Sequence, residues 1–524
     1  MGLITVSLDG GLVTGPSVVD GDYDGPVAAL RHLLASVTGP TDPADAPLAL
    51  VAGTVAGAGA PGTARCAAVG LSPLSGGVAE TRAEGPYAAG LRAAGVTGIV
   101  LYGRAPAPVC VVVSGSAAWL EPAGDLWGLA TGPATDRLLE RYGPGAAVAV
   151  IGPAGEQGVP YASIVTCRHH PLPRLGLGAV LGAKFVKAVV CVGQAVPPVA
   201  DPDRVRVVAE QYARDVRDDR LSVWQRDRPG FGVWSGEPGY APVDQFTDTT
   251  RGGGVGTVPE HIARTATIAP CPSCPTDCIK VYAGAGLHQE ALAMLGPNLG
   301  NPDPWPELSR HEQQGTDPVS ASGTLTVRNV AIPPFDPRVQ PNLGLAYAVA
   351  PIGPRYDMVE HDLDFDPDEG LPASYPELRR LGARVPRPRG ELDVWRTAQL
   401  IRLWSGLDAL GVCLFAATPT RPLSLDRVTD LVEAVDGRRP DVLVLGATRL
   451  VLQHQVNRRL GRGDEQTLPD LFFTEPVRTG RYAGAVLDRT AFTAAATELR
   501  RMLGFGADAE PSASGHPDPR RQGR

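Results

Sequence analysis

The segment Cys271-Pro-Ser-Cys274-Pro-Thr-Asp-Cys278 places three thiols in one short loop of the 524-residue chain. Two residues separate the first pair of cysteines and three separate the second pair, so one loop can present three sulfurs around a single centre. Thiolates are soft ligands that suit iron–sulfur clusters and zinc. Pro272 and Pro275 restrict the backbone of this loop and remove two amide donors. The spacing therefore predicts a metal centre rather than a disulfide frame.

Three thiolates leave one position of a four-ligand site to be filled from elsewhere in the chain. Zinc sites usually fill it from a second local pair of ligands, and the sequence has no second pair of this kind. Cys413, in Asp408-Ala-Leu-Gly411-Val-Cys413, follows a segment with helical periodicity and is the best-placed candidate. A remote fourth cysteine favours a 4Fe-4S cluster. A zinc site and thiols with a merely structural role are the alternatives.

Four further cysteines stand singly in strand-like contexts, at Cys66, Cys110, Cys167 and Cys191. An isolated cysteine in an apolar strand behaves as a small hydrophobic residue. We therefore expect these four to be core residues.

Composition and charge exclude several classes of protein. Hydrophobic residues make up 43% of the chain and charged residues 20%, a globular profile that excludes a disordered or fibrous chain. The formal net charge of −8 provides no excess of positive charge for binding nucleic acid or an anionic membrane, so proteins of these two classes are excluded. The N-terminus has no signal-peptide pattern, and the most apolar stretch, 176–192, is interrupted by Lys184 and Lys187. We therefore expect a cytoplasmic protein of several domains without a membrane span.

The first 195 residues show many short apolar runs between glycine and proline turns, whereas helical periodicity dominates later. Strands are expected at 48–52, 65–70, 98–103, 108–113 and 146–152. Helices are expected at 28–36, 134–142, 205–214, 392–410, 425–435, 447–460 and 491–503. The stretches 302–316 and 351–390 are expected to be loops. The polar tail 507–524 is expected to be disordered.

These patterns predict an α+β protein of three domains. A β-rich domain would occupy residues 1–195. A middle domain with the cysteine loop would occupy 196–345, and a helical C-terminal domain, 346–506, would supply the fourth cysteine.

Two glycine-rich segments match the patterns of nucleotide-binding loops only partly. The segment 57–62 matches GxGxxG, but Pro61 and the strand-like run after it leave no helix N-terminus to hold a pyrophosphate. The segment 174–184 has the wrong spacing for that fingerprint and for a Walker-type loop. We therefore expect no dinucleotide-binding domain.

Short motifs with a constant order run nearly from end to end of the chain. They are Ala52–Pro61 with Arg65, Ser72–Gly77, Ile151–Glu156, Gly178–Lys184, the cysteine loop, Glu290–Asn298, Asp336–Arg338, Leu343–Ala348, Asp408–Cys413 and Thr467–Phe473. Together they resemble the aldehyde ferredoxin oxidoreductase family. Enzymes of this family carry tungsten or molybdenum in a bis-pterin cofactor beside a 4Fe-4S cluster. The resemblance implies that the β-rich domain binds the pterins and that two mainly helical domains enclose cofactor and substrate.

The resemblance also implies ligands for both cofactors. Cys271, Cys274, Cys278 and Cys413 match the family's four cluster ligands. The pterin-binding positions correspond to Arg65, Arg82, Leu172, Arg174, Gly178, Asp317, Asp408 and Gly411.

The resemblance implies a specific role for six of these pterin-binding positions. Arg65 would lie between pterin and cluster, where a planar guanidinium suits a buried polyanion. Asp408 and Gly411 would belong to the cradle of one pterin, and Asp317 to that of the other. Main-chain carbonyls near Arg82 and Leu172 would position a Mg²⁺ that bridges the pterin phosphates.

The implied catalytic residues depart from the family pattern. Glu290 aligns with a family glutamate near the metal and would accept a proton or orient water, with a helix-surface glutamate as the alternative. The family's nearby tyrosine is replaced by Gln289. The family histidine falls on Tyr356, with His361 as a shifted alternative.

The implied function is a redox enzyme that interconverts an aldehyde and a carboxylate and passes single electrons through the cluster to ferredoxin or a similar carrier. The N-terminal signature is reduced to Tyr23-Asp-Gly-Pro, and a helical block usual between Asp317 and Asp336 is missing. A second hypothesis therefore keeps both cofactors but reduces another group, such as an aromatic ring or an intermediate of specialised metabolism. A third is a non-catalytic iron–sulfur electron-transfer protein without pterin. A homodimer is compatible with all three.

Overall fold

The computed structural model describes residues 1–11, 13–17, 25–226, 242–243, 245–249, 267–282, 285–286, 305–322, 325–368, 370–417, 419–463 and 466–506. Gln289, Glu290 and the tail 507–524 lie outside the described residues, so the expectations for them stay predictions.

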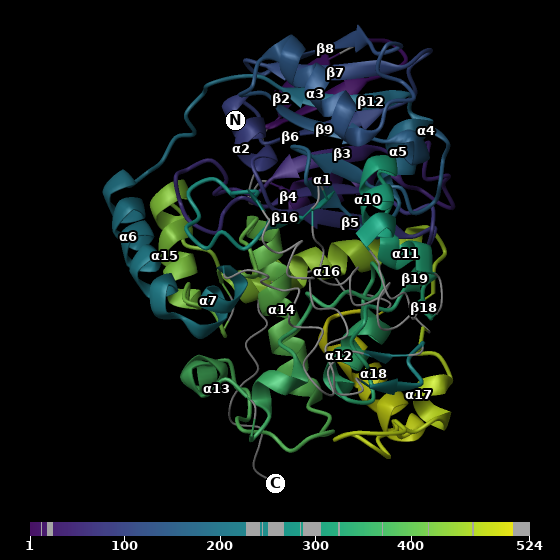
Figure 1. Cartoon of the computed structure of the whole chain (residues 1–524), viewed down its shortest axis with the longest axis vertical. Helices are drawn as coiled ribbons and strands as arrows, with labels where there is room; N and C mark the ends of the chain where they lie inside the picture. The colour runs from purple at the N-terminus through teal and green to yellow at the C-terminus, as the bar shows by residue number, and fades with distance from the viewer. Residues whose placement is uncertain are drawn as a thin grey trace.

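Two six-stranded mixed sheets form the N-terminal part of the chain (Figure 1). The first has the order β2–β1–β6–β3–β4–β5, and only β1 and β6 run parallel. Its strands are β1 (Leu3–Ser7), β2 (Val13–Ser17), β3 (Leu48–Ala52), β4 (Cys66–Leu71), β5 (Val78–Ala83) and β6 (Gly98–Tyr102).

The second sheet has the order β11–β10–β9–β12–β7–β8, and only β7 and β12 run parallel. Its strands are β7 (Val109–Ser114), β8 (Ala117–Pro122), β9 (Ala147–Ile151), β10 (Ile164–Thr166), β11 (His170–Leu172) and β12 (Val186–Cys191). The five strands expected from the sequence are confirmed within one residue at each end.

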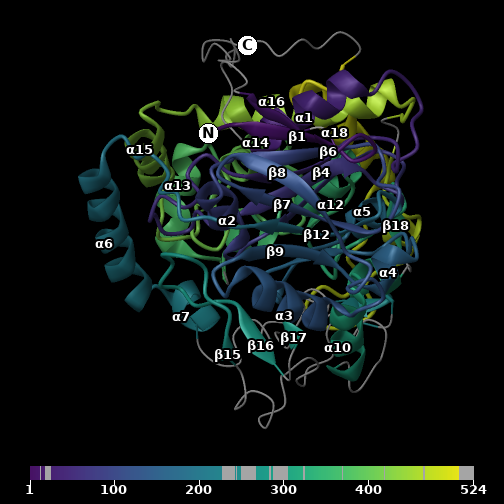
Figure 2. The same ribbon diagram turned by 90° about the horizontal axis from the view of Figure 1, so that it is seen from above.

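The central strands are buried because both faces of the sheets are covered. The strands β3, β4 and β9 are buried at every residue, which explains why they read as continuous apolar runs without alternation. Seen from above, α1 and α16 lie on one side of the sheets and α3 on the other (Figure 2). The covering helices of this region are α1 (Pro26–Ser36), α2 (Tyr87–Ala93), α3 (Thr131–Tyr142), α4 (Pro153–Glu156) and α5 (Leu177–Ala183).

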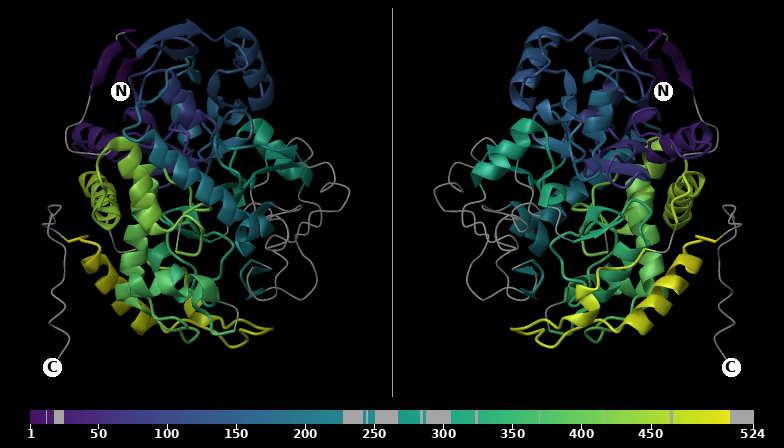
Figure 3. Two further views of the ribbon diagram at one scale, coloured as in Figure 1. Left: turned by 90° about the vertical axis from the view of Figure 1, so that its left-hand side faces the viewer. Right: turned by 90° about the vertical axis from the view of Figure 1, so that its right-hand side faces the viewer.

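Helices dominate the rest of the chain, at the opposite end of the molecule (Figure 3). They are α6 (Pro202–Asp218), α7 (Arg220–Arg226), α10 (Trp305–Gln314), α11 (Pro318–Ser322), α12 (Pro341–Val349), α13 (Tyr375–Arg380), α14 (Val394–Leu410), α15 (Leu425–Asp436), α16 (Val442–Arg459), α17 (Leu471–Thr474) and α18 (Arg489–Met502). Short hairpins and 3₁₀ turns complete this part: β13 (Pro242–Val243), β14 (Asp248–Thr249), β15 (Thr267–Ile268), β16 (Lys280–Tyr282), β17 (Ala285–Gly286), β18 (Thr326–Val327), β19 (Val330–Ala331), η3 (Asp362–Phe365) and η4 (Pro372–Ser374). The predicted α+β class, β-rich first and mainly helical afterwards, is confirmed.

One expectation about local structure is wrong. The stretch 302–316 was expected to be a loop because it is dense in proline, but α10 occupies most of it. Pro306 stands in the first turn of this helix, where a backbone N–H has no partner within the helix and proline is therefore tolerated. Leu308 is buried and anchors the helix.

The helices α14 and α16 connect the two parts of the molecule. They pack against each other, and α16 also contacts α1 and β5 of the first sheet. Leu407 and Leu410 of α14 and Val456 of α16 belong to the same hydrophobic core as the sheet strands. The C-terminal end of α14, which carries Asp408, is therefore held directly against the β-rich part.

No helix of the described ranges combines the length and apolar character needed to cross a membrane. The division into three domains at residues 195 and 345 stays a prediction.

Candidate cofactor and cluster site

The four cysteines of the predicted cluster line one cavity. Cys271, Cys274 and Cys278 come from the loop before β16, and Cys413 comes from the turn after α14. The cavity between them is small, and all four thiols are free. Gly62, Ala64, Glu84, Thr276, Phe415 and Ala416 complete its wall. The predicted convergence of a remote cysteine on the loop is therefore present in the structure.

Within the described residues, no three histidine, cysteine or acidic side chains are arranged around one metal-ion position. A cluster at these four cysteines stays a prediction, with zinc as the alternative.

Burial controls the protonation of these thiols. Loss of solvent raises the pKa of Cys278 to about 12 and raises the pKa of Cys413 well above its usual value. The same cause raises the pKa of Cys271. Because metal ligands must be thiolates, cluster binding would release protons from this cavity.

The cysteine loop is fixed to the preceding helices. The Thr276 and Tyr212 hydroxyls lie 2.9 Å apart, and both side chains are buried. The Cys274 amide donates to the Cys271 carbonyl at 3.2 Å, which closes the first turn of the loop. On the other side of the cavity, the Cys413 amide donates to the Gly62 carbonyl at 2.7 Å. The ligands thus sit on backbone segments that are held independently of any metal.

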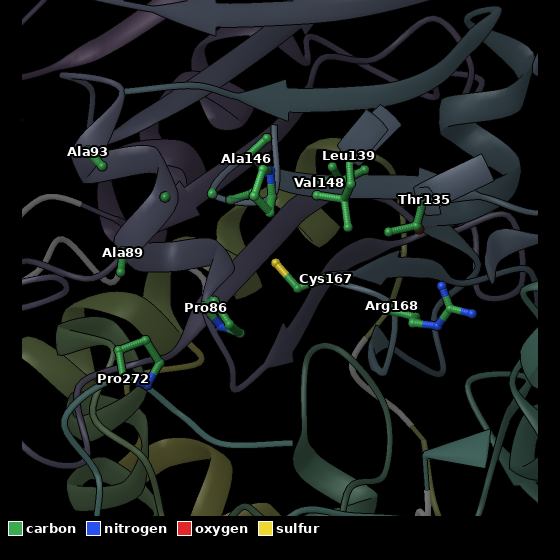
Figure 4. A pocket seen from close by; sticks show the side chains of 14 residues that line it. Pro86, Ala89, Ala93, Thr135, Leu139, Ala146, Val148, Cys167, Arg168 and Pro272 are labelled. Atoms are coloured by element: carbon green, nitrogen blue, oxygen red, sulfur yellow. The ribbon is translucent and has the colours of Figure 1, made fainter. Parts of the chain in front are cut away.

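A second cavity lies against the outer side of the cysteine loop (Figure 4). Pro272 forms one side of it, and the Cys167 sulfur points into its centre. The expectation of four core cysteines is therefore right for Cys66, Cys110 and Cys191, which are buried, and only partly right for the half-buried Cys167. The backbone of Cys167 has a positive φ of 43°, which turns its side chain out of the sheet into this cavity.

Arg65 connects the cluster cavity with a charged region behind it. Its Nε donates to Glu84 Oε1 at 2.8 Å, and its Nη1 donates to Asp408 Oδ1 at 2.5 Å. Nη2 lies 3.5 Å from Asp357 Oδ2. Burial alone would lower the pKa of Arg65, but the three carboxylates raise it well above its usual value. Arg65 is therefore a fixed positive charge between the cluster cavity and Asp408.

Three further arginines extend this charged region. Arg82 of β5 donates to Asp408 Oδ2. Arg355 holds Asp357 with two hydrogen bonds of 2.7 and 2.9 Å. The third, Arg449 of α16, binds the buried carboxylate of Glu80 at 2.6 to 3.0 Å. Four guanidinium groups and four carboxylates thus meet in the interior, in a group that we call the buried charge network.

Two donors of this network are left over. Arg82 Nε and Arg355 Nη1 are buried and have no hydrogen-bond partner among the described residues. A buried guanidinium donor without an acceptor is costly, so these two atoms indicate where a bound anion would be stabilised. The pterin phosphates that the family resemblance implies are anions of this kind. The residues present therefore fit the implied cofactor.

Close backbone contact places Asp408 and Cys413 in the site. A Cβ atom on Gly53, in the turn after β3, would lie 2.2 Å from the Leu410 carbonyl oxygen. Gly411 has φ of 74°, and a Cβ atom there would lie 2.6 Å from the Gly53 Cα. Glycine at both positions thus lets the end of α14 lie directly on the first sheet.

The other implied pterin residues gather around β10 and β11. Leu172 pairs with Ile164 between these strands, and β11 contacts β5, which carries Arg82. At Gly178 a Cβ atom would lie 2.6 Å from the Ser163 carbonyl oxygen. The amide of Ser163 in turn donates to the carbonyl of Gly315 at 2.7 Å.

Asp317 and Arg174 have contacts with protein groups in the same region. The Asp317 carboxylate accepts from the Ser320 amide at 2.8 Å and so caps α11. Arg174 Nη2 donates to the Pro354 carbonyl at 3.0 Å and also to that of Ala331. Arg174 thereby ties the N-terminal part to the loop that carries Arg355.

The two candidates for the family histidine have different surroundings. Tyr356 stands between the network residues Arg355 and Asp357, and its ring stacks on Phe335 with centroids 5.5 Å apart. His361 Nε2 lies 2.9 Å from the Tyr356 carbonyl oxygen, and its side chain also caps the 3₁₀ turn η3. Burial lowers the pKa of His361. The Nε2 atom of His361 is thus engaged with the backbone of the same loop.

Sequence reasoning missed five members of the charge network: Glu80, Glu84, Arg355, Asp357 and Arg449. One signal was available, because Glu80 and Arg82 stand two residues apart in Val78-Ala-Glu-Thr-Arg-Ala83, which also reads as a strand. Charges on one face of a buried strand require buried partners. No local pattern distinguishes Arg449 from the other arginines of the helices.

Two domain models of one protein family match the chain. The model for the aldehyde ferredoxin oxidoreductase N-terminal domain matches residues 22–193, and the model for domains 2 and 3 matches residues 314–515. The chain belongs to the aldehyde ferredoxin oxidoreductase family. Proteins of this family are oxidoreductases that bind a tungsten or molybdenum pterin.

Curated relatives match about half of the chain. A tungsten-containing aldehyde ferredoxin oxidoreductase of Pyrococcus furiosus is 28% identical over 296 residues, which cover 53% of this chain and 48% of the relative. The enzyme of the same description from Thermococcus kodakarensis is 27% identical over 296 residues, which cover 53% of this chain and 48% of the relative. An aliphatic sulfonate oxidoreductase WOR-like subunit of Pyrococcus furiosus is 25% identical over 44% of this chain and 41% of its own length. The match thus spans about half the length of these relatives.

A solved structure shares the fold over nearly the whole chain. It is the active site complex BamBC of benzoyl coenzyme A reductase in complex with 1,5-dienoyl-CoA. The TM-score is 0.76, the sequence identity is 18%, and the match covers 96% of this chain and 94% of the other. The fold of that structure is therefore shared over almost all of the sequence.

We predict that Gly53→Ala disturbs both cofactor regions. The new methyl group would overlap the Leu410 carbonyl, and the end of α14 would have to move with Asp408 and Cys413. Such overpacking typically costs ~1–3 kcal/mol of stability. Thermal unfolding and the metal content of the purified protein would measure the effect. Gly39→Ala is the control, since nothing lies within 4 Å of its added Cβ; equal behaviour of the two variants would contradict the prediction.

Proposed function

We propose that this protein is a redox enzyme with a tungsten or molybdenum bis-pterin cofactor beside a 4Fe-4S cluster. The observation that carries the proposal is the position of Arg65, which binds Glu84 in the wall of the four-cysteine cavity and Asp408 in the charge network. A single side chain thus bridges the region suited to a cluster and the region suited to a polyanion. A cluster alone would need no such network.

The residues would divide the work of binding between them. Cys271, Cys274, Cys278 and Cys413 would hold the cluster. Three arginines would neutralise the pterin phosphates: Arg65, Arg82 and Arg355. The unpartnered donors of Arg82 and Arg355 would form hydrogen bonds with the phosphates. One pterin would be contacted by Asp408 and Gly411. The other pterin would lie near Leu172, Arg174, Gly178 and Asp317. Carbonyls near Arg82 and Leu172 would hold a Mg²⁺ between the phosphates.

The metal of the bound cofactor would supply the oxygen transfer and the two-electron chemistry. This chain's own residues would position the substrate and move protons. Tyr356 would present its hydroxyl at the position of the family histidine, and His361 would support the backbone of the same loop. Glu290 would accept the proton. The cluster would pass single electrons to ferredoxin or a similar carrier in the cytoplasm.

The proposed reaction is the interconversion of an aldehyde and a carboxylate. The second candidate is reduction of another group, such as an aromatic ring. The similarity of fold to the benzoyl coenzyme A reductase complex supports this second candidate. Aldehydes and oxidised substrates can be compared by viologen dye reduction or oxidation with the anaerobically purified protein. Aldehyde-dependent dye reduction would support the first candidate. Its absence from fully loaded protein would overturn that candidate in favour of the second.

Elemental analysis tests the cofactors themselves. The protein is produced with iron, tungsten and molybdenum supplied, purified without oxygen, and assayed for these metals and for pterin fluorescence. We expect iron together with tungsten or molybdenum and pterin. Iron alone would overturn the proposal and favour a non-catalytic electron-transfer protein.

A further inference from the structure

Glu84 occupies a position between the two proposed cofactors that the sequence did not single out. It follows β5 directly, and its side chain forms part of the wall of the four-cysteine cavity. The Cys413 sulfur lies 3.8 Å from Glu84 Oε1. The side chain is only 15% exposed. A carboxylate thus stands beside a position where a cluster ligand would be.

The carboxylate is charged. Arg65 Nε donates to Glu84 Oε1 at 2.8 Å, the geometry of a charge-assisted hydrogen bond. Ionisation therefore follows from the contact with Arg65.

The negative end of this ion pair faces the cavity. Glu84 lines the cavity, whereas Arg65 lies outside its lining. Arg65 also shares its charge with Asp408 and Asp357, neither of which lines the cavity. The cavity therefore experiences the carboxylate more strongly than the guanidinium.

We propose that Glu84 lowers the reduction potential of the cluster and thereby makes the reduced cluster a stronger electron donor. The proposal rests on the proposed function, because it requires the cluster. Reduction adds one electron, and hence one negative charge, to the space between the four thiolates. A fixed negative charge at the wall opposes this addition in a low-dielectric interior, and the potential of an iron–sulfur cluster follows its local charge and hydrogen bonds. The reduced cluster then returns to its oxidised form by passing that electron to the external carrier.

The test is the midpoint potential of the cluster in Glu84→Gln. This variant removes the charge and keeps an oxygen that can accept from Arg65. The anaerobic holoprotein is titrated with redox dyes, and the reduced cluster is followed by electron paramagnetic resonance, which does not depend on turnover. We expect reduction to become at least tenfold more favourable, a shift of ~59 mV or more to positive potential for one electron. Glu121→Gln, on the edge strand β8, is the control and should leave the potential unchanged.

Two outcomes would overturn the proposal. One is an unchanged or more negative potential in Glu84→Gln with its iron content intact. If Glu84→Gln retains no cluster, the titration is made with Glu84→Asp, whose shorter side chain withdraws the charge from the wall. A smaller positive shift in Glu84→Asp then supports the proposal, and no shift overturns it. Wild-type protein without a cluster would instead contradict the proposed function, so the two failures are distinct.

Discussion

Cys413→Ala is expected to remove the visible absorbance and most of the iron of the anaerobically purified protein. Cys413 is the one cavity cysteine that comes from the C-terminal part, and it is 8% exposed. Alanine keeps the backbone contact with Gly62, because that hydrogen bond comes from the main-chain amide. The fold should therefore survive while the cluster loses one of its four ligands. Absorbance spectra and iron per chain measure the result.

Cys110→Ala is the matched control for this substitution. Cys110 is fully buried in a separate small core between α3 and the second sheet. It should keep both iron and absorbance, at a modest cost in stability. Retention of the wild-type spectrum and iron content by Cys413→Ala would show that the four cysteines do not share a cluster.

Glu80→Ala is expected to lower the free energy of unfolding by ~3–5 kcal/mol, because it leaves a buried arginine without its closest partner. Arg449 makes three contacts of 2.6 to 3.0 Å with this carboxylate, and both side chains are almost completely buried. Gln453 of the same helix also donates to Glu80, at 2.8 Å. The pair connects α16 with β5, so its loss should loosen the contact between the two parts of the molecule. Chemical denaturation followed by circular dichroism gives the change.

A double variant separates the cost of a lone charge from the value of the pair. Glu80→Leu with Arg449→Met replaces the pair by apolar side chains and should recover most of the lost stability. Asp426→Ala is the control, because the Asp426–Arg380 pair is more than half exposed and should contribute at most ~1 kcal/mol. The explanation would be wrong if Glu80→Ala cost no more than this control, or if the double variant were less stable than the single one.

The local signals in the sequence were sufficient for most of the regular structure. Continuous apolar runs located β3, β4 and β9, and helical spacing located α14 and α18. The failure at α10 came from the density of Pro, Asp and Arg in this stretch, which indicated a loop, although the first turn of a helix tolerates proline.

The candidate site could be predicted only where its residues belong to a motif. The spacing of the cysteine loop and the DxxGxC segment indicated Cys271, Asp408 and Cys413, and the structure places the cysteines on one cavity. Arg65 and Asp408 are 343 residues apart in the chain, and no pattern in the sequence states that they meet. The catalytic assignments to Glu290, Tyr356 and His361 stay predictions.

The sequence by itself therefore determined the family and the change from strands to helices, and it indicated four candidate cluster ligands, because these depend on residue type, spacing and periodicity along the chain. The tertiary structure decided that Glu84 faces the cysteine cavity, that Arg355 carries an unpartnered donor and that Arg449 neutralises Glu80. A charged residue has the same local sequence signature whether it lies in water or in the interior. Only the packing of α14 and α16 on the first sheet removes these groups from water, and the loss of hydration makes each of them require a partner.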